Sequence, residues 1–237
     1  MSVTAHPTPQ SGVPRTARLW PPLTVFPWAQ LLFIVVLAAV LSFALGPLTF
    51  TLGHNTYRIL WYGSGLVLSA AAIGVAAVSV PRLREYDLAR PAARWGNLVV
   101  VLLGQAAVFV LAIGVVVHSH RLRKGFVAAN IYEKGWVHLE QLVSNTVFTM
   151  GCALILIPLL GRVWGSAAAA LVIAGCVGLC YVVPSGRGMP YTYHAGTDPW
   201  FDPWSVAWAL GALAVGALVW WRTGGAWSRL ANLSTPW

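Results

Sequence analysis

Residues 97–117 read NLVVVLLGQAAVFVLAIGVVV, a run of 21 residues without a charged side chain. A helix of about 20 apolar residues crosses the hydrocarbon core of a bilayer, whereas strands of a membrane β-barrel alternate in polarity over about ten residues. The continuous run therefore predicts a transmembrane α-helix and argues against a barrel strand.

Similar apolar runs recur along the chain and predict an all-α fold, a polytopic transmembrane helical bundle over residues 26–222. Composition agrees, because 58% of the 237 residues are hydrophobic and only 9% are charged, against about 25% charged residues in a typical soluble domain. The six expected spans are 28–47, 58–81, 97–117, 141–161, 166–184 and 204–221.

The two ends of the chain lack such runs. Residues 1–25 contain five prolines and few large aliphatic side chains, so we expect a flexible tail. This segment also lacks the early apolar core of a signal peptide. Residues 223–237 are expected to form a second, short tail.

The positive charges indicate the orientation of the bundle. With the N-terminus inside, nine Arg and Lys residues fall on the inner side and six on the outer side. Short cytoplasmic loops carry the excess of Lys and Arg, so both ends are expected in the cytoplasm, in a bacterial-type inner membrane. The basic stretch 118–124 is the exception, since it falls on the outer side. Topology thus accounts for the net charge of +9, and no nucleic-acid partner is expected.

Histidines and carboxylates collect on the predicted outer side. Five of the six histidines and four of the six carboxylates fall there. Imidazole and carboxylate groups are common ligands of zinc, copper and iron, so the pattern predicts a metal centre near the outer face. The candidate ligands are His118, His120, His138, Glu140 and His194, with Glu133 and Asp198 as proton-transfer or supporting residues.

Simpler interpretations of these residues stay open. Polar side chains gather in the loops of any membrane protein, and His138 could be an interfacial histidine bonded to a backbone carbonyl. Asp198 directly precedes Pro199, as a turn-forming aspartate often does. His118 and His120 share a side only if their segment is extended.

The segment 183–203, VPSGRGMPYTYHAGTDPWFDP, is unusually long for a loop. Loops of about twenty residues are uncommon unless they are functional or disordered. Its four aromatic side chains favour order, so we expect it to fold over the outer face.

Glycine, tryptophan and cysteine side chains within the spans are interpreted as structural. Small residues let helices approach closely in lipid, which assigns helix packing to Gly63, Gly65, Gly175, Gly178, Gly211 and Gly216. Tryptophans near span ends are typical of the membrane interface, namely Trp20, Trp28, Trp61, Trp136, Trp164, Trp204, Trp220 and Trp221. The cysteines are expected to be buried thiols, at Cys152, Cys176 and Cys180.

Two segments within about residues 82–162 resemble the large subunit of bacterial nitric oxide reductases, relatives of the haem-copper oxidases. Residues 84–86 (REY) are similar to the family's R-E-Y/F-L-E-x-P segment, and residues 135–140 (GWVHLE) to its W-V-V-H-L-W-V-E-G helix. The resemblance implies that His138 ligates a non-haem iron. It makes Glu140 a weaker match to the family's proton-delivering glutamate, which stands four residues after its histidine.

The family's remaining histidines are missing from this chain. Its paired histidines should fall near 176–183, where none is present, and the haem ligands have no counterpart. Haem is therefore not expected.

Two functions follow as alternatives. The first is an integral membrane subunit that holds or supports a redox metal centre of copper or iron near the outer face. It would belong, with other membrane subunits, to an oxidase, a reductase or a copper-dependent monooxygenase. The second is a non-catalytic membrane scaffold or small transporter, although no internal repeat supports a transporter. No charged residue lies in the middle of a span, which argues against an ion pathway.

Overall fold

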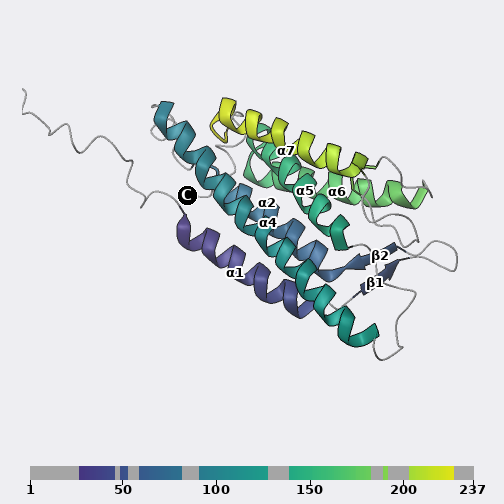
Figure 1. Cartoon of the computed structure of the whole chain (residues 1–237). Helices are drawn as coiled ribbons and strands as arrows, with labels where there is room; N and C mark the ends of the chain where they lie inside the picture. The colour runs from purple at the N-terminus through teal and green to yellow at the C-terminus, as the bar shows by residue number, and fades with distance from the viewer. Residues whose placement is uncertain are drawn as a thin grey trace, which may run out of the picture.

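The computed structural model describes residues 27–45, 49–52, 59–81, 91–127, 139–182, 189–191 and 203–226. This part of the chain forms a helical bundle with one small β-hairpin (Figure 1). Five of its helices are long and apolar enough to cross a membrane, as in a multi-pass membrane protein. The elements are α1 (Trp28–Leu45), β1 (Thr49–Leu52), β2 (Ile59–Tyr62), α2 (Gly63–Val78), α4 (Pro91–Val127), α5 (Leu139–Leu160), α6 (Arg162–Val182) and α7 (Pro203–Thr223).

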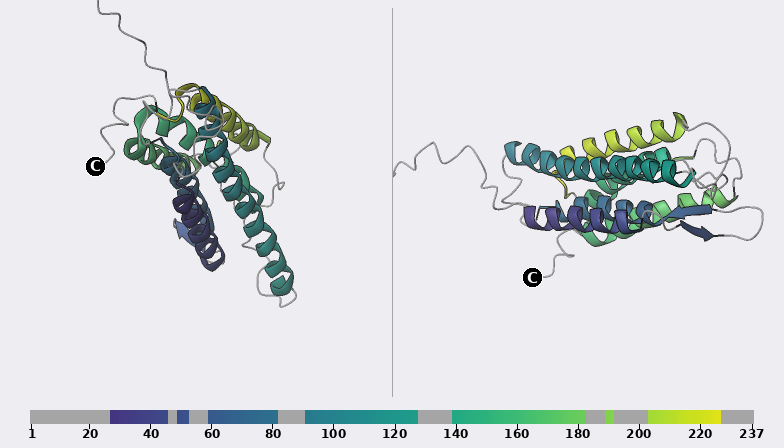
Figure 2. Two further views of the ribbon diagram at one scale, coloured as in Figure 1. Left: turned by 90° about the vertical axis from the view of Figure 1, so that its left-hand side faces the viewer. Right: turned by 60° about the horizontal axis from the view of Figure 1, so that its bottom comes forward.

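The bundle has two distinct ends (Figure 2). At the hairpin end, β1 and β2 pair antiparallel, α1, α4 and α6 end, and α2, α5 and α7 begin. At the opposite end lie Arg94 of α4, Arg162 of α6 and Arg222 of α7, and we call it the arginine end. The prediction that the arginine end faces the cytoplasm stays a prediction.

Helix α5 forms the centre of the bundle. It packs against α2, α4, α6 and α7, and 78% of its Gln141–Leu160 stretch is buried, against 17% of Trp28–Leu45 in α1. The outer helices instead expose large apolar side chains, such as Phe33 of α1, Leu171 of α6 and Leu210 of α7. Exposed apolar surface of this kind contacts lipid in a membrane-embedded bundle.

The second expected span is wrong at its beginning. Residues 59–62 form β2, which pairs with β1 in the register Thr49↔Tyr62, so the fold is not purely helical. An apolar run alone does not distinguish a strand from a helix, and the sequence ILWY is rich in strand-forming side chains. Helix α2 begins only at Gly63 and, with 16 residues, is about 24 Å long.

Helix α4 is much longer than the predicted span 97–117. It begins at Pro91, a residue favoured in the first turn of a helix, and continues to Val127 through the basic stretch 118–124. The apolar run in the sequence predicts only the membrane-spanning part of the helix. The helix itself continues at both ends.

The expected gap between the fourth and fifth spans is reduced to one residue. Helix α5 ends at Leu160 and α6 begins at Arg162, while Gly161 has a φ of +87° that side-chain-bearing residues rarely adopt. Gly165 then lies against the last turns of α5, where an added Cβ would be 2.6 Å from the Leu156 carbonyl oxygen.

The packing role predicted for the glycines holds for some of them. Gly63 and Gly65 are buried, and an added Cβ at Gly216 of α7 would lie 2.8 Å from the carbonyl oxygen of Gly151 in α5. For Gly175, Gly178 and Gly211 the prediction is wrong within the described part of the chain, where no atom lies within 4 Å of an added Cβ.

The interfacial role predicted for the tryptophans also needs one correction. Trp164 and Trp204 are exposed as expected, whereas Trp220 is fully buried. Cys152 is buried, as predicted for the thiols, whereas Cys176 is only half-buried.

Candidate functional site in the bundle interior

The predicted metal site lies mostly outside the described residues. His138, His194, Glu133 and Asp198 fall there, and for His120 and Glu140 only the helical backbone is described. Among the residues that the structure describes, no three His, Cys, Asp or Glu side chains are grouped as a metal site requires.

His118 is the one candidate ligand whose side chain is described. It is exposed, and its ring stands edge-on to Phe43 of α1 with ring centroids 5.3 Å apart. Because His118 and His120 belong to one helix, α4, they are about 200° apart around its axis. The extended arrangement that would place both histidines on one side is therefore absent from this segment.

Buried side chains that are polar but uncharged mark a different candidate site. They concentrate from the hairpin end to the middle of the bundle, and we call this set the polar interior. Its members are Ser42 of α1, Ser64 and Ser69 of α2, Gln105 of α4, Gln141, Ser144, Asn145, Thr146 and Thr149 of α5, Tyr191, and Ser205 of α7.

Tyr191 reaches the interior from the long segment 183–203. Its side chain is completely buried and meets Phe148 of α5 with ring centroids 6.5 Å apart. The segment was expected to fold over the outer face. At Tyr191 the segment instead places its side chain inside the bundle.

Three hydroxyl groups form a directed chain across the polar interior. Thr149 of α5 donates its proton to the carbonyl oxygen of Asn145 at 2.8 Å, so towards Ser69 it can only accept. The Ser69 hydroxyl is 3.4 Å from that of Thr149 and 3.3 Å from that of Tyr191. If both contacts are hydrogen bonds, Tyr191 donates to Ser69 and Ser69 donates to Thr149. Both distances exceed the usual 2.7–2.8 Å for hydroxyl pairs, so the chain is loosely made.

Three other buried oxygen atoms of the polar interior have no hydrogen-bond partner among the described residues. The Gln105 side chain donates through Nε2 to the carbonyl oxygen of Ala72 at 2.9 Å, while its Oε1 is buried and has no partner among the described residues. The same holds for the hydroxyls of Ser42 and Ser64. Buried polar atoms are nearly always paired with protein or water, so these three atoms require a partner other than the described residues.

The interior near the arginine end is closed and apolar. We call it the apolar interior: Ala76, Leu98, Val101, Ala153, Leu154, Ile157 and Trp220. The buried Ser79 and Asn97 side chains at this level are bonded to main chain, whereas Trp220 Nε1 is buried without a partner among the described residues. Ser79 donates to the carbonyl oxygen of Val75 at 2.8 Å, and Asn97 to that of Gly224 at 2.9 Å.

The polar interior was not predicted from the sequence, because the candidate site residues were chosen among histidines and carboxylates and the side chains of the polar interior are neutral. Gln141, Asn145 and Thr149 recur every four residues within an apolar span. This spacing places them on one helix face and was a readable signal. The insertion of Tyr191 had no such local signal.

Comparison of the chain with family models, with curated proteins and with solved structures yields no match. The resemblance to the nitric oxide reductase subunit therefore stays a prediction from residues 84–86 and 135–140.

Proposed function

We propose that the protein is a small membrane transporter whose polar interior receives an uncharged polar solute from the hairpin end. One observation carries the proposal. Buried hydrogen-bonding atoms without a described partner, Gln105 Oε1 and Ser64 Oγ, accompany the loosely bonded hydroxyl chain of Ser69.

The chemistry of the polar interior selects the class of solute. Its members are hydroxyls and amides, which both donate and accept hydrogen bonds and carry no charge. A bare ion would lose its hydration without receiving an opposite charge, a cost of many kcal/mol. A small polyol or amide would exchange hydrogen bonds to water for hydrogen bonds to these side chains.

The apolar interior supports the proposal that the solute enters from the hairpin end alone. Leu154, Ile157 and Trp220 are fully buried, and the one hydrogen-bonding side-chain atom among them is the donor Trp220 Nε1. Transporters alternate access by moving one part of the bundle against another. Release on the arginine side would accordingly require α5 to separate from its neighbours there.

Uptake into reconstituted vesicles tests this proposal. Radiolabelled glycerol and urea serve as probes, and Gln105→Leu removes the free acceptor while keeping a buried side chain of similar size. Gly175→Ala serves as the matched control, since nothing lies within 4 Å of its added Cβ. We expect uptake of at least one probe above that of protein-free vesicles, a reduction of about tenfold in Gln105→Leu, and no change in the control. Uptake equal to protein-free vesicles for both probes would overturn the proposal.

A redox metal centre at the hairpin end is the second candidate. It is favoured by topology, because the end of α4, with His118 and His120, and the start of α5, with Glu140, lie at the same end of the bundle. His138 directly precedes α5, and copper or iron would suit imidazole and carboxylate ligands.

Metal analysis separates the two candidates. The metal hypothesis predicts copper or iron in protein purified with any partner subunits, and its loss in His138→Ala with the helices still inserted. Equal metal in both proteins, or none in the wild type from metal-replete cells, would contradict it.

A further inference from the structure

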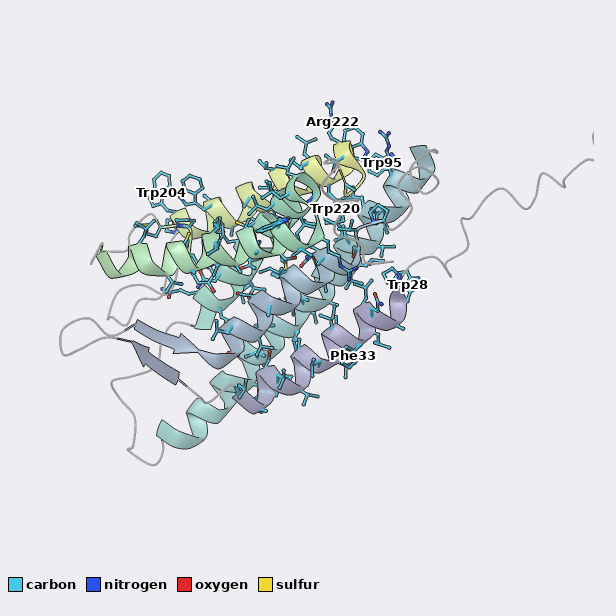
Figure 3. The ribbon with its side chains drawn as sticks, turned by 180° about the vertical axis from the view of Figure 1, so that it is seen from behind. Trp28, Phe33, Trp95, Trp204, Trp220 and Arg222 are labelled. Carbon is cyan, nitrogen blue, oxygen red and sulfur yellow. The ribbon has the colours of Figure 1, made fainter. Side chains whose placement is uncertain are left out.

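Arginine and tryptophan side chains gather where α4 and α7 meet at the arginine end. The guanidinium of Arg222 stands 5.5 Å over the ring of Trp221, and that ring lies 5.6 Å from the ring of Trp95 on α4. Arg94 precedes Trp95 and is exposed, as is Arg222. Figure 3 shows Trp95 and Arg222 close together at this end, with Trp204 at the other end of α7.

The charge of this group is not balanced within the described structure. None of the six carboxylate side chains of the chain lies among the described side chains. Helix α4 also begins here without an acidic residue in its first turn. The first N–H groups of a helix have no partner within the helix, and together with the positive end of its dipole they favour an anion.

Two apolar stripes continue from the group along the helices. On α4, Val99 and Leu103 follow Trp95 at intervals of four residues. On α7, Leu218 precedes Arg222 by four residues. All three aliphatic side chains are at least half exposed, and residues four apart lie one above another on a helix face.

A hydrogen bond and a close approach join the two helices at their meeting point. Asn97 of α4 donates to the carbonyl oxygen of Gly224 just after α7. Gly225 has a φ of +89°, and an added Cβ there would lie 2.9 Å from Asn97 Nδ2. The arginines therefore project from helices that are joined to each other, which limits the entropy lost when they bind a ligand.

We propose that this group binds the headgroup of an anionic phospholipid. Arg94 and Arg222 bind the phosphate, Trp95 and Trp221 lie at the level of the glycerol backbone, and the acyl chains cover the stripes below. The stripes favour a lipid over a free phosphate ion, because only a lipid carries the apolar chains that would cover them. The site is independent of the solute proposed for the polar interior, and it agrees with the predicted cytoplasmic location of the arginine end.

Thermal unfolding in mild detergent with added lipid provides the test. The probes are phosphatidylglycerol, phosphatidylcholine and sodium phosphate, each titrated against the wild type and Arg94→Gln/Arg222→Gln. Lys124→Gln, which removes a positive charge at the far end of α4, is the control. We expect phosphatidylglycerol alone to raise the unfolding temperature. Its apparent affinity should fall about 25-fold in the double variant, at about fivefold per arginine, and remain unchanged in the control.

Each other outcome contradicts the proposal. Equal effects of the two lipids would mean that charge plays no part, and an equal effect of sodium phosphate would mean that the site takes a free anion. Unchanged affinity in the double variant would place the lipid elsewhere. If the double variant does not fold, the salt dependence of phosphatidylglycerol binding to the wild type provides the test. Raising the salt concentration from about 0.05 M to 0.5 M should weaken this binding, because salt screens the charges.

Discussion

The two halves of the bundle interior are lined by the same central helix, and both contain clusters of buried apolar side chains, but they differ in how many buried polar side chains they hold. Towards the hairpin end, Thr149 of α5 lies 3.4 Å from the Ser69 hydroxyl, which lies 3.3 Å from that of Tyr191, and further buried amides and hydroxyls are present. Towards the arginine end, α5 presents Leu154 and Ile157 to Trp220 and the aliphatic side chains of α2 and α4.

Because of this difference, we expect one half of the interior to stabilise the bundle and the other half to bind a solute. Apolar side chains packed without gaps hold helices together through dispersion, since lipid gives no hydrophobic drive for their association. Weak hydrogen bonds between neutral groups add only about 0.6 kcal/mol each in a membrane. We therefore expect the arginine-end half to hold the bundle together and the hairpin-end half to be free to bind.

The largest effect is expected where α6 turns back on α5. Gly165→Ala would place a Cβ against the main chain of Ile157, so the helices must move apart, at a cost of about 3 kcal/mol. Unfolding in detergent measures the loss. Gly175→Ala on the same helix is the matched control and should be neutral, since nothing lies within 4 Å of its Cβ. Similar losses in both variants would contradict the tight packing of the arginine-end half.

The next effect concerns the apolar interior itself. Leu154→Ala removes a fully buried side chain and should lower the free energy of unfolding by about 2–3 kcal/mol, through lost contacts and a residual cavity. Leu210→Ala on α7, whose side chain is exposed, provides the comparison and should cost less than about 0.5 kcal/mol. Equal losses would show that the two positions do not differ in packing.

A smaller effect is expected at the joint between α4 and α7. Asn97→Leu removes the hydrogen bond to the carbonyl oxygen of Gly224 and should cost about 1–2 kcal/mol, because a buried carbonyl loses its partner. The unfolding free energy measures it. A stabilised variant would mean that the turn at Gly224 finds another partner.

The smallest effect is expected in the polar interior. Tyr191→Phe and Ser69→Ala each remove a hydroxyl from the chain that ends at Thr149. A double-mutant cycle in detergent should give a coupling free energy of about 0.6 kcal/mol. A coupling above about 2 kcal/mol would show that the hydroxyl chain is a tight structural element, and the contrast between the two halves would fail.

Six apolar helices could be predicted from the sequence, and five of them are long enough to span a membrane, but their ends could not be predicted. Uncharged runs of about twenty residues fix where helices lie in lipid, as 97–117 did for α4. They contain no signal for a helix that continues beyond the apolar run through the basic stretch 118–124. The same limit applies to residues 59–62, whose apolar character suits a strand as well as a helix.

The candidate site was accessible to sequence reasoning only in part. The spacing of Gln141, Asn145 and Thr149 marks a polar helix face, whereas the role of Tyr191 depends on a contact with Ser69, 122 residues away in the chain. The predicted metal ligands His138 and His194 lie outside the described residues, so that hypothesis stays a prediction.

Accessibility of single cysteines tests the contrast between the two halves most directly. In a chain with Cys152, Cys176 and Cys180 replaced by Ala, a cysteine would be placed at Ser64 or Gln105 and, for comparison, at Ala76 or Ala153. A small charged thiol reagent is then added from either side of sealed vesicles. We predict that the first pair reacts from the hairpin side alone and that the second pair reacts from neither side. Equal reaction of all four positions, or reaction of the first pair from the arginine side, would contradict the account.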